Sequence, residues 1–377
     1  MTHPILILCV LVALLQLTHV VASPVIQTEK HAISYQVITS GLSHPWSIAF
    51  LPDGKILVSE RGGNLRLIDS QGDLEPAPIK GVPPIRQHGQ GGLLDIVIHP
   101  DFINNQWVYF SYAESDGYRV GTTVSRGRLK NRQLEQVEVI FQMDRKTKAR
   151  QHFGSRLVFD RQGYLYITLG DRGDRPRAQD LNDHAGSLIR LHDDGRVPQD
   201  NPFIGISGVK PEIYSYGHRN MQGAALNPQT GKVWTHEHGP QGGDEINVPD
   251  AGLNYGWPVI SYGVNYVIGT KIGEGSHKKG MVQPIHYWIP SIAPSGMAFY
   301  TGNAFKGWQG NLFVGSLKFQ QLVRLELDGE TITHEERLLS DELGRIRDVR
   351  QGPDGLIYLV TDEENGKLVR LSPSPES

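Results

Sequence analysis

Two side chains in residues 149–171, ARQHFGSRLVFDRQGYLYITLGD, could perform proton transfer. His152 precedes a strand-like apolar run, and Asp171 ends the next one. Imidazole is the usual general base near neutral pH, and a carboxylate that accepts its ring N–H fixes its tautomer. The residues alone leave a plainer interpretation open, in which His152 is a polar loop residue bonded to backbone and Asp171 initiates a turn.

A second group of residues could bind an anion. Arg345 and Arg347 in GRIRDVR alternate along the start of a strand, so their guanidinium groups should point to the same side and could grip carboxylates. Gln90 in HGQGG is flanked by glycines, which let the backbone approach a ligand closely. An exposed basic strand edge and an ordinary glycine-rich turn are the alternatives.

The stretch 234–247 raises the question of a metal. His236 and His238 stand without another ligand cluster, which makes zinc a weak hypothesis. Calcium prefers oxygen ligands, and the Gly-Pro turn that follows exposes carbonyl groups, while Asp244 and Glu245 add carboxylates. Without further information the same stretch could be a turn with a helical cap.

The elements that must position these residues are β-hairpins. An apolar pair, a polar turn and a β-rich run recur along the chain, and each instance is the pattern of two strands joined by a tight turn. The instances start at Trp46, Leu94, Ser155, Gln222, Ser295 and Arg347. We predict an all-β fold, a six-bladed β-propeller with four-stranded antiparallel blades, in which loops at one end converge on the axis. A β-sandwich is the alternative.

Composition agrees with this fold and excludes several functions. Among 377 residues there are 43 Gly and 23 Pro, as expected for many tight turns. The net charge of −3 argues against nucleic acid as a partner. The GQGG stretch is not the G-x-G-x-x-G of a nicotinamide site, and no βαβ alternation surrounds it. Neither a phosphate-binding Gly-Lys-Ser/Thr loop nor a G-x-S-x-G nucleophile elbow occurs.

The N-terminal stretch 1–23 is apolar and ends in small residues, which predicts a secretory signal peptide and a periplasmic or secreted protein. An uncleaved membrane anchor is the alternative. After cleavage we expect no stable membrane insertion and one propeller domain over 24–377. Cys9, the only cysteine, lies in the signal, so disulfides and zinc–thiolate sites are not expected.

Several motifs together resemble one known family. They are HGQGGLLDIVIHPDF, QHFGSRLVFD, SYGHRNMQGAALNP, EHGPQGGDEIN, NYGWPVISYG, SGMAFY and RIRDVRQGPDG. The chain from about His44 to its C-terminus resembles the soluble aldose dehydrogenases that depend on pyrroloquinoline quinone (PQQ), which include glucose and sorbosone dehydrogenases. The family fold is a six-bladed propeller.

The resemblance implies roles for individual residues. His152 would be the general base and Asp171 would orient it. The residues implied in PQQ binding are Gln90, Arg219, Asn220, Tyr266, Lys318, Arg345 and Arg347. A calcium ion on the quinone would be bound by the carbonyl groups of Gly239 and Pro240. A second, structural calcium would lie at Glu245 and Tyr255.

The implied reaction is oxidation of the C1 hydroxyl of aldose sugars to lactones, with hydride transfer to calcium-bound PQQ. An external acceptor, a cytochrome or a quinone, would then take the electrons. Two other functions stay open. One is a calcium-dependent lactonase, which would need no positively charged residues to bind a cofactor, and the other is a propeller that only binds a partner. The polar stretch 264–280 departs from the family pattern and could line the sugar cleft.

Overall fold

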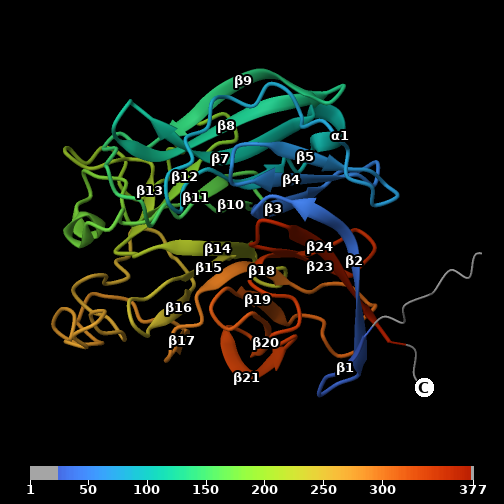
Figure 1. Ribbon diagram of the computed structural model, residues 1–377. Helices are drawn as coiled ribbons and strands as arrows, with labels where there is room; N and C mark the ends of the chain where they lie inside the picture. Colours follow the sequence, from blue (N-terminus) through green and yellow to red (C-terminus); the bar gives the residue numbers. More distant parts are fainter. Residues whose placement is uncertain (1–23, 375–377) are drawn as a thin grey trace, which may run out of the picture.

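A computed structural model describes residues 24–374, which form six antiparallel sheets arranged around a central axis (Figure 1). We number the sheets as blades in chain order. Blade 1 consists of β3 (Pro45–Phe50), β4 (Ile56–Glu60) and β5 (Leu65–Ile68). Blade 2 consists of β6 (Leu93–Ile98), β7 (Trp107–Ser115), β8 (Val120–Lys130) and β9 (Gln133–Gln142). Blade 3 consists of β10 (Leu157–Phe159), β11 (Leu165–Thr168), β12 (Ser187–Leu191) and β13 (Ile213–Tyr216).

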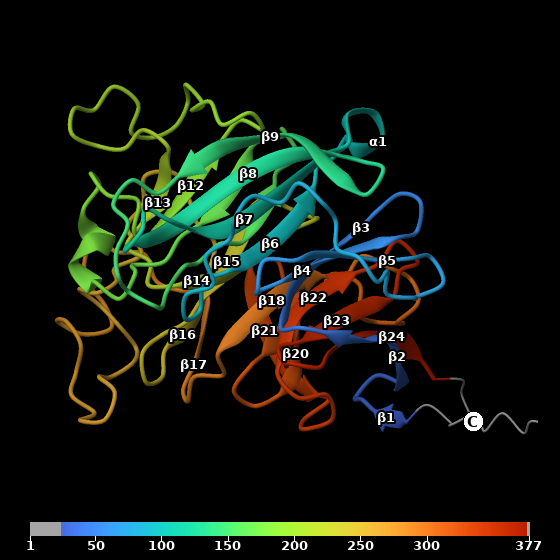
Figure 2. The same ribbon diagram turned by 45° about the horizontal axis from the view of Figure 1, so that its top comes forward.

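Blades 4 to 6 complete the ring (Figure 2). Blade 4 consists of β14 (Met221–Leu226), β15 (Val233–Glu237), β16 (Asp244–Asn247) and β17 (His286–Trp288). Blade 5 consists of β18 (Pro294–Phe299), β19 (Leu312–Ser316), β20 (Gln321–Asp328) and β21 (Thr331–Leu338). Blade 6 consists of β22 (Ile346–Gln351), β23 (Ile357–Thr361), β24 (Gly366–Pro373), β2 (Ala32–Leu42) and β1 (Val25–Gln27).

The six predicted hairpins are confirmed as the first two strands of the six blades. First strands of neighbouring blades pack on each other around the axis, for example β3 on β6 and β14 on β18. Buried apolar side chains fill the space between the sheets: one cluster joins Phe313 of β19 and Leu322 of β20 to Val349 of β22 and Leu359 of β23. Each blade is therefore held mainly by its two neighbours.

The expectation of four strands per blade is wrong for two blades. Blade 1 has three strands, because residues 69–92 run to blade 2 and form only isolated bridges, such as the one between Ile68 and Leu74. Blade 6 gains strands from the other end of the described chain, because β2 pairs with β24 in a register that places Val37 opposite Val369. This pairing closes the ring, as the blue and red strands side by side in Figure 1 show.

The described part of the chain contains little helix. The structure has one short α-helix, α1 (Phe102–Asn105), and one 3-10 helix, η1 (Arg175–Gln179). Neither of these two elements in residues 24–374 has the length and apolar character needed to cross a bilayer. The predicted signal peptide, 1–23, lies outside the described residues.

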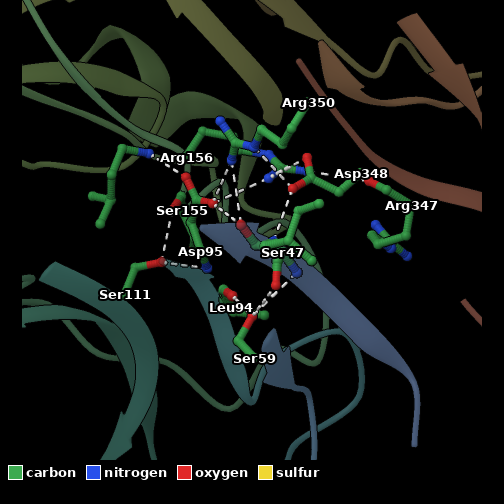
Figure 3. Close-up of polar contacts among 12 residues, drawn as sticks. Ser47, Ser59, Leu94, Asp95, Ser111, Ser155, Arg156, Arg347, Asp348 and Arg350 are labelled. Carbon is green, nitrogen blue, oxygen red and sulfur yellow. Dashed lines mark hydrogen bonds and ion pairs between the residues drawn. The ribbon is translucent and has the colours of Figure 1, made fainter. Parts of the chain in front are cut away.

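Buried charges link the first strands at the axis (Figure 3). Asp95 of β6 accepts hydrogen bonds from Ser47 of β3 at 2.6 Å and from Arg350 of β22 at 2.9 Å. Arg156, which precedes β10, lies 3.1 Å from Asp95 and 2.9 Å from Asp348 of β22. None of these carboxylates is exposed. This axial network ties blades 1, 2, 3 and 6 together with groups that are costly to leave unpaired.

Removing one acid from the axial network should therefore destabilise the whole ring. We expect Asp95→Ala to lower the free energy of unfolding by about 3–5 kcal/mol, because it leaves the Arg156 charge buried without one of its two acidic partners. Chemical denaturation measures this loss. Asp53→Ala is the matched control, since Asp53 pairs with Lys55 at the surface and should contribute less than about 1 kcal/mol. Equal losses in the two variants would contradict the assigned role of the network.

Candidate functional site

Two adjoining cavities open at one end of the axis. The outer cavity, of about 670 Å³, is lined by residues that include His152, Asp171 and Trp257. The inner cavity, of about 480 Å³, is lined by residues that include Arg347 and Asp362. The residues common to both cavities are Gln90, His238, Ala293 and Lys318. The loops that sequence reasoning expected to converge on the axis do so here.

Most of the predicted site residues gather in these cavities. Those that line the outer cavity are Gln90, His152, Asp171, Arg219, Gly239, Pro240, Tyr266 and Lys318. Those that line the inner cavity are Gln90, Asn220, Lys318, Arg345 and Arg347. The two that line neither are Glu245 and Tyr255. They lie in a small recess beside the outer cavity, and the residues that line both are Arg219, His238, Gly239, Pro240 and Trp257.

His152 and Asp171 form a hydrogen-bonded pair. His152 lies in the connection from β9 to β10, and Asp171 follows β11 in the next turn of the same blade. The His152 Nδ1 atom lies 2.6 Å from Asp171 Oδ1. The loop holds the ring in place with a left-handed backbone at His152 (φ 56°) and Gly154 (φ 64°), and the Gln90 side chain accepts the backbone N–H of His152 at 2.8 Å. Gln90 thus supports His152, which sequence reasoning did not foresee.

The surroundings favour a neutral imidazole. Burial lowers the pKa of His152 below its ordinary value, and the positive charges of Arg219 and Arg172 act in the same direction, although the hydrogen bond to Asp171 opposes them. Burial alone would raise the pKa of Asp171, but the hydrogen bond from His152 and the charge of Arg219 bring it below its ordinary value. An ionised Asp171 that accepts Nδ1–H leaves the Nε2 lone pair free to accept a proton.

The lowered pKa of His152 has a kinetic consequence if the ring acts as a base. A base works only when unprotonated, so activity falls as the pH drops through its pKa. We therefore expect the acidic limb of the kcat/KM profile to lie below pH 6.5, the ordinary histidine value. A steady-state pH profile measures it. A limb above pH 7 would contradict a neutral resting imidazole.

The inner cavity carries a surplus of positive charge around one acid. Asp362, which follows β23, pairs with Arg347 and lies 3.6 Å from Arg345, 3.9 Å from Arg61 and 3.2 Å from His44. Burial would raise the Asp362 pKa, but these arginines hold it well below its usual range. The buried Nε atoms of Arg61 and Arg347 have no hydrogen-bond partner within residues 24–374. Lys318 adds a cation over the Phe319 ring, 5.0 Å from its centroid. A multiply charged anion fits this charge balance.

Arg219 lines the outer cavity, and its neighbour Asn220 lines the inner one. Arg219 donates to the backbone carbonyl of His238 at 2.8 Å, and its guanidinium lies 5.3 Å from the centre of the Trp257 ring. The Asn220 side-chain oxygen accepts the backbone N–H of Gly154 at 3.1 Å. Both side chains therefore hold loops of the site in place.

The Gly239–Pro240 turn borders the outer cavity beside the pair. The carbonyl oxygen of Gly239 accepts no backbone hydrogen bond in the described chain, whereas that of Pro240 accepts the Tyr266 hydroxyl at 2.9 Å. Asp244 lies behind the turn, where its carboxylate accepts the N–H groups of Gly239 at 2.8 Å and Ala293 at 2.7 Å. Asp244 therefore shapes the turn, and the carbonyl of Gly239 stays without a backbone partner, as a cation ligand requires.

Two acids meet in the recess beside the outer cavity. Glu237 of β15 and Glu245 of β16 are direct cross-strand partners, and Asn247 donates to Glu237 at 3.0 Å. Burial and the charge of Glu237 raise the pKa of Glu245 well above its usual range. Within residues 24–374 no cluster of three or more His, Cys, Asp or Glu side chains has metal-site geometry, so a cation here would also need carbonyl ligands. Tyr255 lines the same recess.

The structure adds site residues that sequence reasoning missed. Trp257 donates its indole N–H to Asp171 at 2.8 Å. Trp46 lines the inner cavity, and the Arg156 guanidinium lies 4.1 Å from the centre of the Trp46 ring. His238, considered above only as a weak zinc ligand, bonds the Pro294 carbonyl at 2.6 Å, and burial lowers its pKa to about 3. The position of Asp362 could have been recognised in the sequence, because it directly follows a predicted strand, β23, much as Asp171 follows β11.

Comparison with known proteins gives consistent matches. A family model described as glucose/sorbosone dehydrogenase matches residues 42–370. The chain is similar to the aldose sugar dehydrogenase YliI of Escherichia coli, with 47% identity over 90% of this chain and 93% of that protein. The crystal structure of the soluble aldose sugar dehydrogenase from Escherichia coli in its apo form superposes with a TM-score of 0.88, at 46% identity over 91% of this chain and all of that one. The PQQ-bound aldose sugar dehydrogenase from Streptomyces coelicolor superposes with a TM-score of 0.73, at 27% identity over 93% of this chain and all of that one.

Proposed function

Because this chain belongs to the glucose/sorbosone dehydrogenase family, we propose that it is an aldose sugar dehydrogenase that works with PQQ and calcium. The observation that carries the proposal is the placement of the His152–Asp171 pair in a cavity that adjoins the cationic inner cavity. A base and an anion site side by side are what sugar oxidation with a negatively charged quinone requires.

The residues present fit the cofactor. PQQ is a flat tricarboxylate, and the inner cavity offers more positive charge than Asp362 neutralises. We propose that the side chains that would hold PQQ are Gln90, Arg219, Asn220, Tyr266, Lys318, Arg345 and Arg347. When bound, the quinone supplies a two-electron acceptor for the hydrogen on the sugar C1 carbon.

The chain's own residues move the proton. The Nε2 atom of His152 accepts the proton of the C1 hydroxyl as the sugar is oxidised, and the product is a lactone. Asp171 keeps the Nδ1–H bond and stabilises the imidazolium that forms. His152 then releases the proton to solvent through the open side of the outer cavity, while an external cytochrome or quinone takes the electrons. We place the enzyme in the periplasm or outside the cell.

The proposal includes two calcium-binding sites. The free carbonyl of Gly239 and that of Pro240 border the outer cavity, where a cation could polarise the cofactor. Glu245 and Tyr255 would hold a second ion, and it would neutralise the facing carboxylates of Glu237 and Glu245.

The second site gives a stability prediction. We expect a chelator to lower the melting temperature of the wild type by several degrees, because an unfolded chain does not bind the ion and two buried acids then face each other. In Glu245→Gln the melting temperatures with and without calcium should differ much less, because only the site at the Gly239–Pro240 turn remains. Thermal scans with calcium or chelator measure both. A chelator effect that persists at full size in Glu245→Gln would contradict this assignment.

The function itself is tested by reconstitution. Apoprotein is mixed with PQQ and calcium, and sugar-dependent reduction of an artificial dye is followed. Activity that needs both additions is the expected result. Lactone hydrolysis without PQQ would favour the lactonase alternative, and failure to bind PQQ would contradict the proposal.

A further inference from the structure

Asp171 is held from two sides. Its Oδ1 atom accepts His152 Nδ1–H at 2.6 Å and the backbone N–H of Gly173 at 2.7 Å. Its Oδ2 atom accepts the indole N–H of Trp257 at 2.8 Å, the one hydrogen bond of that oxygen among residues 24–374. The Asp171 side chain has 0% exposure, so solvent does not replace a lost donor. The orientation of the carboxylate therefore depends on both sides.

Trp257 is itself firmly placed. Its backbone N–H donates to the Gly217 carbonyl at 2.9 Å, and its carbonyl accepts the Gln179 side chain at 2.7 Å. The guanidinium groups of Arg175 and Arg219 lie 5.4 Å and 5.3 Å from the centre of its ring, and 5% of the residue is exposed. The direction of the indole N–H is thus imposed by the surrounding loops.

Two other buried tryptophans make the comparison informative. Trp234 and Trp308 are both fully buried, and their indole N–H groups have no hydrogen-bond partner within the described residues. The fold therefore tolerates a buried indole N–H without a partner. The bond from Trp257 to Asp171 is a specific feature of the site.

We propose that Trp257 is a positioning residue that fixes the Asp171 carboxylate and, through it, the ring of His152 in the orientation that proton transfer requires. The proposal rests on the proposed function for its kinetic consequences. Without the indole N–H, the carboxylate is restrained only through Oδ1 and can turn more easily about its Cβ–Cγ bond, so the direction of the imidazole is less well defined. The Asp171 charge, which the indole N–H no longer stabilises, then interacts more strongly with protonated His152 and raises the pKa of that ring.

The kinetic test compares Trp257→Phe with Trp308→Phe in the enzyme loaded with PQQ and calcium. Loss of a hydrogen bond to a charged group is large enough to lower kcat by about tenfold. We expect this fall in Trp257→Phe with a sugar KM within about twofold of the wild type, and an acidic limb of the pH profile moved to higher pH. The other charged or titratable groups that face the pair, Arg172, Arg219 and His238, remain in place. Trp308→Phe should change none of these quantities.

A second measurement does not depend on activity. Apoprotein labelled with ¹⁵N in histidine gives ring signals by NMR, and the His152 signal is identified by its absence in His152→Gln. We expect its Nδ1–H signal to shift or broaden in Trp257→Phe and to stay unchanged in Trp308→Phe. If Trp257→Phe does not fold, benzothienylalanine at position 257 keeps the shape and removes only the N–H.

The outcomes separate the two proposals. An unmoved His152 signal together with an unmoved acidic limb would overturn the role of Trp257. A wild type that oxidises no aldose would refute the proposed function, and the NMR comparison would still decide whether Trp257 positions His152.

Discussion

Replacing His152 by Gln will lower kcat for aldose oxidation by about three orders of magnitude, while the variant still binds PQQ. General-base catalysis contributes typically 10²- to 10⁴-fold, and Gln keeps hydrogen-bonding groups at this position without being able to take a proton. His152 and Asp171 do not line the inner cavity, so its cationic wall, formed by Arg61, Arg345 and Arg347 around Asp362, stays intact. Dye reduction and cofactor titration on the same preparation separate the two properties.

His88→Gln is the matched control for this experiment. His88 lies two residues before Gln90, and its Nε2 atom lies 3.2 Å from the Lys148 carbonyl, but it lines neither cavity. Its substitution should leave kcat within about twofold. Retention of more than a tenth of the wild-type kcat in His152→Gln would show that another group removes the proton.

The double variant Lys318→Met/Arg345→Met should weaken PQQ binding by about 10²- to 10³-fold. Each lost charge-assisted contact contributes about 1.5–3 kcal/mol, and some of that is recovered by solvent at these exposed positions. Lys318 forms no ion pair in the described chain, and Arg345 lies 3.6 Å from an acid that Arg347 already pairs with. The two substitutions therefore remove positive charge without leaving a buried acid alone.

A titration of apoprotein with PQQ measures this loss directly. Lys148→Met is the control, because Lys148 is exposed on a neighbouring loop and lines neither cavity. The positive charges of Lys318 and Arg345 also predict a dependence on salt, which should weaken PQQ binding to the wild type more than to the double variant. Unchanged affinity in the double variant would place the anion elsewhere.

Sequence patterns predicted the fold well because each blade is a local structure. The hairpins starting at Trp46 and Arg347 are closed by the short loops 51–55 and 352–356, and alternation identifies their strands without long-range information. The family predicted from motifs is confirmed by the match over residues 42–370. The number of strands in blade 6 could not be predicted, because β2 and β24 carry no local signal that they pair.

The candidate site was predictable where a residue type alone indicates its chemistry. His152, Asp171 and the arginines near the inner cavity are such residues, and the structure brings them to one end of the axis. The contacts of Gln90 and Trp257 were not predictable, since they depend on loops from different blades meeting in space. The axial network was missed for the same reason: Ser47, Asp95 and Arg350 are far apart in the chain.

The pairing of β2 with β24 also sets the order in which the molecule can be completed. During synthesis β2 leaves the ribosome among the first described segments, yet its partner β24 is the last of the described strands to emerge. Blades 1 to 5 need no residue beyond β21, whereas blade 6, which carries the cationic wall at Arg347 and Asp362, can close only when β24 arrives. Pairing over such a long stretch of chain is slow compared with hairpin formation. The cationic side of the inner cavity is therefore complete only once β24 has paired with β2, so binding of the cofactor should follow that pairing.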